Sequence, residues 1–418
     1  MPRVLLLIPT TSYKATDFLA ASEKLNIDVI VGSNHRQTLE SVAPGYSLPL
    51  SFDNLQEALP QALAFIKRYP IDAVVSTDDD AVVLAAQIAQ SLGLSHNPPE
   101  ATWATRNKYQ LKKKLTDAGV QTACYECFSI TDSPKEIAAR LDFPVVLKPI
   151  HLSASRGVIR ANTPEEFKTA FERIVTILKE PDSRSHDESD QKILVESFIP
   201  GVEVALEGLL DNGTLTTLAL FDKPDPLDGP FFEETLYVTP SRLSEATQQA
   251  IAQTAQQACD AIGLKEGPVH AELRVNEQGP FLIEVAARSI GGLCSRTLTF
   301  GLGISLEELI LQQAMKRPFP ALQRKEKGSG VMMIPIPAAG SVQKAGVLMD
   351  IQGIDEAKKI AGIHQVVITI RRKQKVIPLP EGRQYLGFIF ARGETPEQVE
   401  QALRQAHQAL RFTIASYT

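Results

Sequence analysis

The first hundred residues alternate short apolar runs with helical patterns, and this alternation limits the possible folds more than any other feature of the chain. The expected elements are strands at 3–9, 27–31 and 72–76 and helices at 14–25, 55–69 and 81–92. Parallel strands need a long crossover between them, and a helix is the usual crossover. We therefore predict an α/β domain over residues 1–100, with helices on the faces of a parallel sheet.

The common phosphate-binding loops of such domains are missing from the sequence. No Gly-x-Gly-x-x-Gly follows an expected strand in this region, and no Gly-x-x-x-x-Gly-Lys-Ser/Thr occurs anywhere. The acidic stretch from Thr77 to Asp80 follows the third expected strand. We interpret it as the cap of a helix N-terminus rather than as a metal site.

Composition limits the partners of the chain. Its 43 basic and 49 acidic residues give a net charge of -6, which argues against a broad surface for nucleic acid or anionic membrane. The longest apolar runs are about six residues, far short of the roughly 20 that span a bilayer. Four cysteines in 418 residues do not make a disulfide framework. We predict a cytoplasmic protein. If its ligand is anionic, a few individual basic side chains must bind it.

Two lysines in the middle of the chain are candidates for such cations. Lys108 falls on the apolar stripe of a helix expected from Thr105 to Ala118, where a buried ammonium needs an anion. Lys148 ends the short apolar strand that starts at Phe143, and a small, hydroxyl-rich loop follows it. The backbone amides of such a loop can approach a phosphate. The lysines at 112–114 are interpreted as a solvated face.

A hairpin over 269–285 carries the strongest chemical signal. If residues 277–279 form a three-residue loop with Gly279 in the left-handed region, Glu272 lies directly opposite Glu284. Their β-carbons would then be about 5 Å apart, and two facing carboxylates call for a cation between them. Hard oxygen ligands favour Mg²⁺, with Mn²⁺ as a second possibility. Alternatively, one or both glutamates face solvent or pair with an arginine.

Small residues and one arginine follow this hairpin. Arg288, Ser289, Gly291 and Gly292 lie within eight residues of Glu284, and an arginine beside a metal site suits phosphate transfer. His270 shares a strand face with Glu272 and either contacts substrate or is structural. Glu233 and Glu234 either bind an incoming ammonium group or are solvated.

These motifs, taken in order, resemble the ATP-grasp ligases. The resemblance implies an ATP-grasp fold, α/β and α+β, with a pre-ATP-grasp domain at 1–100, an ATP-grasp domain at 101–320 that includes a lid at about 120–198, and a C-terminal α+β unit at 321–418. It also implies ATP as the nucleotide. The residues matched to ATP binding are Lys108, Lys148, Ser153, Ser155, Arg156, Gly157, Glu196, Ser197, Phe198, Ile199 and Glu203.

The same resemblance assigns the metal and the reacting groups. Glu272 and Glu284 match the magnesium ligands, Arg288 matches the residue that holds the γ-phosphate and the reacting carboxylate, and backbone amides near Ser289, Gly291 and Gly292 would stabilise an oxyanion. Position 286 is Ala where the family often has a further metal ligand. Residues 153–157 match the family's phosphate-covering loop, called the phosphate loop below, and contain a single glycine. Both departures put details of the site in question.

Within the superfamily, the segments at 229–235, 287–292 and 385–391 are most similar to the L-amino-acid ligases. The expected activity is ADP-forming amide or peptide synthesis from a small carboxylate and an amine, through an acyl phosphate. One alternative is a carboxylase-type or purine-synthesis-type enzyme that activates bicarbonate or a small acid. Another is a protein that binds ATP without turnover. A homodimer is possible.

Overall fold

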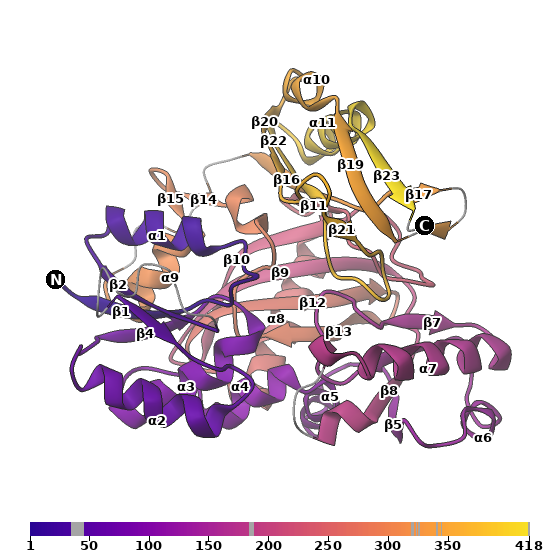
Figure 1. The fold of residues 1–418 in the computed structure, drawn as a ribbon, viewed down its shortest axis with the longest axis horizontal. Helices are drawn as coiled ribbons and strands as arrows, with labels where there is room; N and C mark the ends of the chain where they lie inside the picture. The colour runs from indigo at the N-terminus through magenta and orange to yellow at the C-terminus, as the bar shows by residue number, and fades with distance from the viewer. Residues whose placement is uncertain are drawn as a thin grey trace.

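The fold is described from a computed structural model. It describes residues 1–34, 46–183, 188–318, 322, 324, 327–339, 342–343 and 345–416. The expected boundary between residues 320 and 321 lies outside these residues, so the division into three domains stays a prediction. Figure 1 shows the N-terminal elements at one end of a long central sheet, a smaller layered unit around α7 at the other, and the C-terminal elements above the sheet.

The N-terminal sheet confirms the prediction from alternation. Its strands run parallel in the order β3-β2-β1-β4. They cover Ser47–Pro49, Asp28–Ser33, Arg3–Leu7 and Ala73–Ser76. One face packs on α1 (Ala15–Lys24), and the other packs on α2 (Leu55–Ile66) and α3 (Val82–Leu92). We did not predict β3, because three residues are too few to show a periodicity.

The helix expected from Thr105 to Ala118 is in fact two helices. α4 covers Pro99–Arg106, α5 covers Lys108–Asp117, and the break is at Asn107. The Asn107 side chain accepts a hydrogen bond from the Gln110 amide at 3.0 Å and so caps α5. Lys108 is therefore the first residue of α5.

The unit around α7 is a four-stranded antiparallel sheet covered by two helices, and we call it the lid. Its strand order is β5-β8-β6-β7. The bounds are β5 Tyr125–Ser129, β6 Val145–Pro149, β7 Ile159–Ala161, β8 Lys192–Ser197, α6 Pro134–Ala138 and α7 Pro164–Leu178. Aromatic and aliphatic residues of α7, including Phe167 and Phe171, fill the core between helix and sheet.

The central sheet has eight strands in the order β13-β12-β9-β10-β11-β16-β22-β20. They cover Gly279–Ala286, Gly267–Asn276, Val202–Asp211, Thr214–Lys223, Leu236–Thr239, Gly328–Ile334, Gly387–Gly393 and Ile363–Ile368. The last three strands, β16, β22 and β20, belong to the C-terminal unit expected at 321–418, and they continue the same sheet. The α8 helix (Glu245–Ile262) packs on the β9, β12 and β13 end, where its apolar face forms one core with those strands.

The remaining elements complete the C-terminal part and the connections. They are α10 Ile354–Lys358, α11 Pro396–Ala409, β19 Gly346–Gln352, β21 Lys375–Val376, β23 Arg411–Ser416, β14 Thr299–Phe300, β15 Ile304–Ser305, β17 Ala338–Ala339, β18 Val342–Gln343 and the short 3-10 turns Asp79–Ala81, Pro181–Ser183, Glu188–Gln191 and Cys294–Thr297. The β19 and β23 strands pair outside the central sheet. Neither was expected from the sequence.

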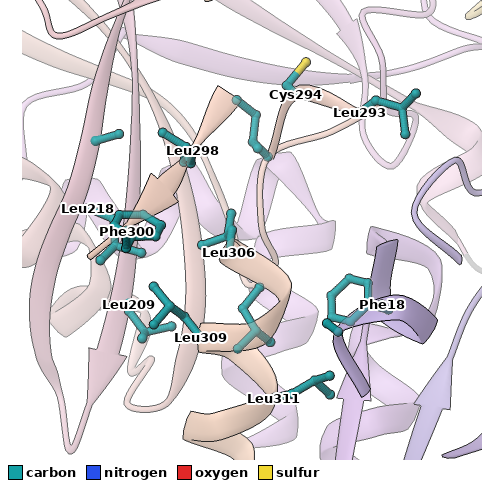
Figure 2. Close-up of a cluster of buried hydrophobic side chains, with 14 of the residues drawn as sticks. Phe18, Leu209, Leu218, Leu293, Cys294, Leu298, Phe300, Leu306, Leu309 and Leu311 are labelled. Atoms are coloured by element: carbon teal, nitrogen blue, oxygen red, sulfur yellow. The ribbon is translucent and has the colours of Figure 1, made fainter. Parts of the chain in front are cut away.

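One apolar core joins the N-terminal domain to the central sheet. α9 (Leu306–Ala314) lies between them and packs on Phe18 of α1 on one side and on Leu209 and Leu218 of the sheet on the other (Figure 2). Leu293 and Cys294 belong to the same core. The chain just after Gly292 is therefore anchored, which limits the movement of the residues before it.

No helix among the described residues is long and apolar enough to cross a membrane.

Candidate active site

The hairpin of β12 and β13 brings Glu272 opposite Glu284, as predicted, but by a different route. Asn276 pairs with Gly279, so the loop has two residues and not three. A register shift follows between Glu272 and Leu273, where Ile283 is the extra residue on β13. This β-bulge adds back the residue that the shorter turn removes. Gly279 has a φ of +103°, a conformation that favours glycine.

A cleft between the lid and the central sheet collects most of the predicted nucleotide residues, and we call it the nucleotide cleft. Its open volume is about 720 Å³. The predicted residues that line it are Lys108, Lys148, Ser153, Ser155, Glu196, Ser197, Phe198, Ile199, Glu203, Glu234, Glu272 and Glu284. The Lys108 ammonium donates to the Leu152 carbonyl at 2.6 Å and lies 4.0 Å from a Glu284 oxygen. It faces both the phosphate loop and the carboxylate pair.

Glu196, one of the residues matched to ATP binding, lies buried between two lysines. Its Oε2 accepts from the Lys148 ammonium at 2.8 Å, and its Oε1 is 3.5 Å from the Lys112 ammonium. Burial raises the pKa of Glu196, but the two lysines outweigh burial and leave that pKa lowered. Burial also lowers the pKa of Lys148, and Glu196 more than reverses this. Glu196 thus keeps Lys148 charged at the cleft.

Lys112 is buried and not part of a solvated face. Its ammonium donates to the Thr122 hydroxyl at 2.7 Å and to the Leu282 carbonyl at 3.3 Å. Burial is the main influence on its pKa and lowers it to about 8. Leu111 and Leu115 are buried, as the apolar stripe predicted, and Lys112 lies beside them on α5. The interpretation of Lys112 failed because its counter-ion, Glu196, belongs to the distant strand β8 and leaves no local signal.

A further lysine, which the sequence analysis missed, lies among three carboxylates that line the same cleft. The Lys223 ammonium lies 2.8 Å from Glu203, 2.5 Å from Glu234 and 3.5 Å from Glu272. One oxygen from each of these glutamates lies within 4.8 Å of the other two. Burial lowers the pKa of Lys223, but the three carboxylates outweigh it and hold the pKa well above its usual value. We call Glu203, Glu234 and Glu272 the carboxylate cage.

The cage continues through a histidine to a fully buried carboxylate. His270 is within 3.2 Å of Glu272 through Nε2 and within 3.2 Å of Glu207 through Nδ1. Burial lowers the pKa of His270, but the hydrogen bonds to Glu207 and Glu272 outweigh it and raise the pKa. Both Glu207 oxygens also accept from the Ile290 amide at 3.0 Å. His270 therefore links the cage to the segment after Arg288.

The segment Arg288–Gly292 is held by the N-terminal domain, by Glu207 of β9 and by Phe388 of β22, and we call it the junction segment. Arg288 donates twice to Asp79 of the N-terminal domain, at 2.8 and 2.9 Å. The buried Lys14 ammonium donates to the Ser289 carbonyl at 3.1 Å and to its hydroxyl at 3.2 Å. The acidic stretch at 77–80 therefore does more than cap a helix, because Asp79 is the counter-ion of Arg288.

The amides expected to stabilise an oxyanion are not all free. The Ile290 amide is bound to Glu207, so it is not available to a ligand. A β-carbon at Gly291 would meet no heavy atom within 4 Å, whereas one at Gly292 would lie 2.8 Å from the Phe388 ring. Gly291 thus borders open space, and Gly292 packs against the C-terminal strand β22.

Arg156 and Gly157 end the phosphate loop but do not line the cleft. Arg156 is buried and donates to Glu180 at 2.6 Å, to Asp182 at 3.1 Å and to the Glu381 carbonyl at 2.8 Å. These contacts account for its guanidinium without a ligand, and the assignment of Arg156 to ATP stays a prediction. Glu233, His270 and the junction segment also lie outside the residues that line this cleft.

The missed residues had weak signals in the sequence. Lys223 ends the apolar strand β10 just as Lys148 ends β6, and it pairs directly with Glu203 across β9 and β10. Glu207 lies on the same strand face as Glu203, four residues along β9. Lys14 and Asp79 had no local signal, because the residues that they bind in the junction segment are more than 200 residues away.

Comparison with known proteins agrees with this architecture. Residues 141–297 match the family model of the ATP-grasp domain, residues 19–96 match the ATP-grasp N-terminal domain, and residues 340–415 match the L-amino acid ligase C-terminal domain 2. The chain is thus an ATP-grasp protein. Within that superfamily it is similar to the L-amino-acid ligase branch.

Individual relatives point to the same branch. An L-amino acid ligase structure from Bacillus licheniformis superposes with a TM-score of 0.83 and 26% identity, over 100% of this chain and 99% of that one. Dapdiamide A synthase of Enterobacter agglomerans is 29% identical over 62% of this chain and 60% of its own length. Alanine--anticapsin ligase of Bacillus subtilis is 23% identical over 61% of this chain. The match spans 56% of that relative.

Proposed function

We propose that this protein is an ATP-dependent carboxylate–amine ligase that makes an amide or peptide bond and releases ADP and phosphate. The observation that carries the proposal is the nucleotide cleft, where Lys108 and Lys148 face the paired carboxylates of Glu272 and Glu284. The full-length likeness to an L-amino acid ligase structure supports an amino acid as one substrate. Amino acid ligation is also what distinguishes this proposal from other ATP-grasp activities.

The charges at the cleft suit a nucleotide and a divalent metal. Lys108 and Lys148 would neutralise phosphate oxygens, and Ser153 and Ser155 would lie along the phosphates. Glu272 and Glu284 pair across β12 and β13, and their carboxylate oxygens are the ligands that Mg²⁺ prefers; Mn²⁺ accepts the same set. A bound metal would neutralise charge on the transferred phosphoryl group. Lys223 and His270 keep Glu272 ionised for this role, since together they lower its pKa against the effect of burial.

The proposed reaction has two steps. A substrate carboxylate oxygen attacks the γ-phosphorus, the bond to the bridging oxygen breaks, and ADP leaves. An amine nitrogen then attacks the acyl carbon, phosphate leaves with the electrons of the C–O bond, and the nitrogen loses a proton. Arg288, fixed by Asp79, would bind the reacting carboxylate and stabilise the oxyanion. Glu234 binds the Lys223 ammonium, and Glu233 beside it stays a candidate for binding the substrate amine.

The test is ADP and phosphate release by the wild type and Glu284→Gln, measured over a panel of amino acids supplied alone and in pairs. We expect release only when an acid and an amine are both present. Loss of a metal-binding carboxylate should reduce the rate by at least about 100-fold. Glu277→Gln, in the exposed turn of the same hairpin, is the matched control and should keep the wild-type rate.

Other outcomes would replace this function with an alternative. AMP and pyrophosphate as products would exclude an acyl phosphate. ADP release that depends on bicarbonate, with no need for an amino acid, would indicate a carboxylase-type enzyme. Equal background rates for the wild type and Glu284→Gln, together with nucleotide binding, would indicate a protein that binds ATP without turnover.

A further inference from the structure

A segment of the C-terminal part extends away from its own sheet and reaches the lid. It lies between β21 and β22, and Figure 1 shows this loop running from the upper, C-terminal elements toward β7 and α7. We call residues 378–382 the strap. Its first three residues are buried, and the Gly382 amide closes a turn onto the Pro378 carbonyl at 2.8 Å. A β-carbon at Gly382 would lie 1.7 Å from the Ile377 carbonyl, so this turn requires glycine.

The strap binds the end of the phosphate loop through two backbone carbonyls. The Pro380 carbonyl accepts from the Gly157 amide at 2.9 Å, and the Glu381 carbonyl accepts from Arg156 Nε at 2.8 Å. Ala154 and Ser155 of this loop have φ values of +54° and +55°, a region that residues other than glycine rarely adopt. A loop with two such residues in succession needs contacts from outside to hold its shape.

The Glu381 side chain makes a second contact with the lid. Arg173 of α7 donates to both Glu381 oxygens, at 2.5 and 2.9 Å. The Arg173 guanidinium also lies 4.9 Å from the centre of the Phe231 ring. Phe231 forms a β-bridge with Ile159 of the lid and precedes the cage residue Glu234 by three positions. Arg173 therefore contacts both the strap and the segment that leads into the cage.

We propose that Glu381 is a positioning residue for nucleotide binding. Its carbonyl and carboxylate hold the phosphate loop and α7 in the arrangement that closes the nucleotide cleft, although Glu381 itself does not line the cleft. The C-terminal part thus controls how well the cleft binds the phosphates. This inference rests on the proposed function only in naming the ligand as an adenine nucleotide.

The experiment compares nucleotide affinity and loop exchange in a charge-swap series. MgADP binding is measured by calorimetry for the wild type, Glu381→Gln, Glu381→Arg, Arg173→Glu and the Glu381→Arg/Arg173→Glu double variant. We expect Kd to rise about threefold for Glu381→Gln, since the pair is partly exposed. Glu381→Arg and Arg173→Glu each place two like charges side by side, and each should raise Kd about tenfold. The double variant should recover most of the affinity, which general damage to the fold would not allow.

Glu172→Arg is the matched control, since Glu172 is the neighbour of Arg173 on α7 and its side chain is 61% exposed. It should leave Kd unchanged. Hydrogen exchange of residues 152–158, measured without nucleotide, should be faster in Glu381→Arg and normal in the double variant. Wild-type exchange and Kd in Glu381→Arg would overturn the inference. Failure of the wild type to bind MgADP would instead count against the proposed function, and the exchange data would still test the strap.

Discussion

The nucleotide cleft and the junction segment both contain buried charges, but the sequence separation between each charge and its counter-ion differs. In the cleft, lysines meet carboxylates from nearby strands of the lid and central sheet, such as Lys148 with Glu196 and Lys223 with Glu203. In the junction segment, Arg288 and Ser289 meet Asp79 and Lys14 of the N-terminal domain. The comparison indicates that the charges of the cleft are neutralised within the lid and the central sheet, whereas those of the junction segment are neutralised by the N-terminal domain.

Replacing Lys223 with Met tests the cleft side of this comparison and should have the largest effect. Three carboxylates would then face one another without their ammonium, so we expect a loss of about 3 kcal/mol in stability. Excess MgCl₂ without nucleotide should recover part of the loss, because a divalent cation can replace the ammonium. Thermal unfolding with and without MgCl₂ measures both effects.

The exposed Lys265 gives a control for the loss of one positive charge. Lys265→Met should unfold like the wild type and should not respond to MgCl₂. A Lys223→Met variant with wild-type stability in both buffers would mean that the ammonium does not hold the cage together.

Asp79→Asn tests the contact between domains and should have an intermediate effect. Burial raises the pKa of Asp79, but Arg288 and Arg106 outweigh it and lower this pKa from 3.8 to about 2. A lowered carboxyl pKa stabilises the fold above the unfolded value, here by about 2 kcal/mol at neutral pH. That contribution is lost as pH falls from about 4 to about 2.

Urea unfolding of both proteins from neutral to acid pH measures this difference. The free energy of unfolding should be higher for the wild type than for Asp79→Asn at pH 7, and the two values should converge as the pH approaches 2. Loss of ligase activity should accompany the change, with the affinity for MgADP retained, since Arg288 lies outside the nucleotide cleft. A parallel loss of MgADP affinity would contradict the separation of the two regions.

A pair of glycine substitutions tests the contact between the junction segment and β22 and should have the smallest effect. Gly292 has a φ of +59° and is packed against Phe388, so Gly292→Ala should cost about 1–2 kcal/mol. Gly291→Ala should change stability little, because its β-carbon would enter open space. Urea midpoints of the two variants give the comparison. Equal midpoints would show that β22 does not constrain this segment.

Much of the fold and of the cleft could be predicted because the signals are local. A parallel sheet follows from alternation, and strand pairing places Glu272 opposite Glu284 even though the turn was expected one residue too long. The roles of Glu196 and Lys112 could not be predicted in the same way. Leu111 and Leu115 of α5 are buried as periodicity predicts, but only the fold brings Glu196 of β8 to the neighbouring Lys112.

The sequence by itself determined the fold class, the hairpin with its two glutamates, and Lys148 at the end of an apolar run, because each depends on spacing within a few residues. The tertiary structure alone decided that Asp79 holds Arg288, that Lys223 fills the carboxylate cage and that Glu381 reaches the phosphate loop. The physical reason is that a buried charge requires a counter-ion, but the identity of that counter-ion depends on which distant segments the fold brings together.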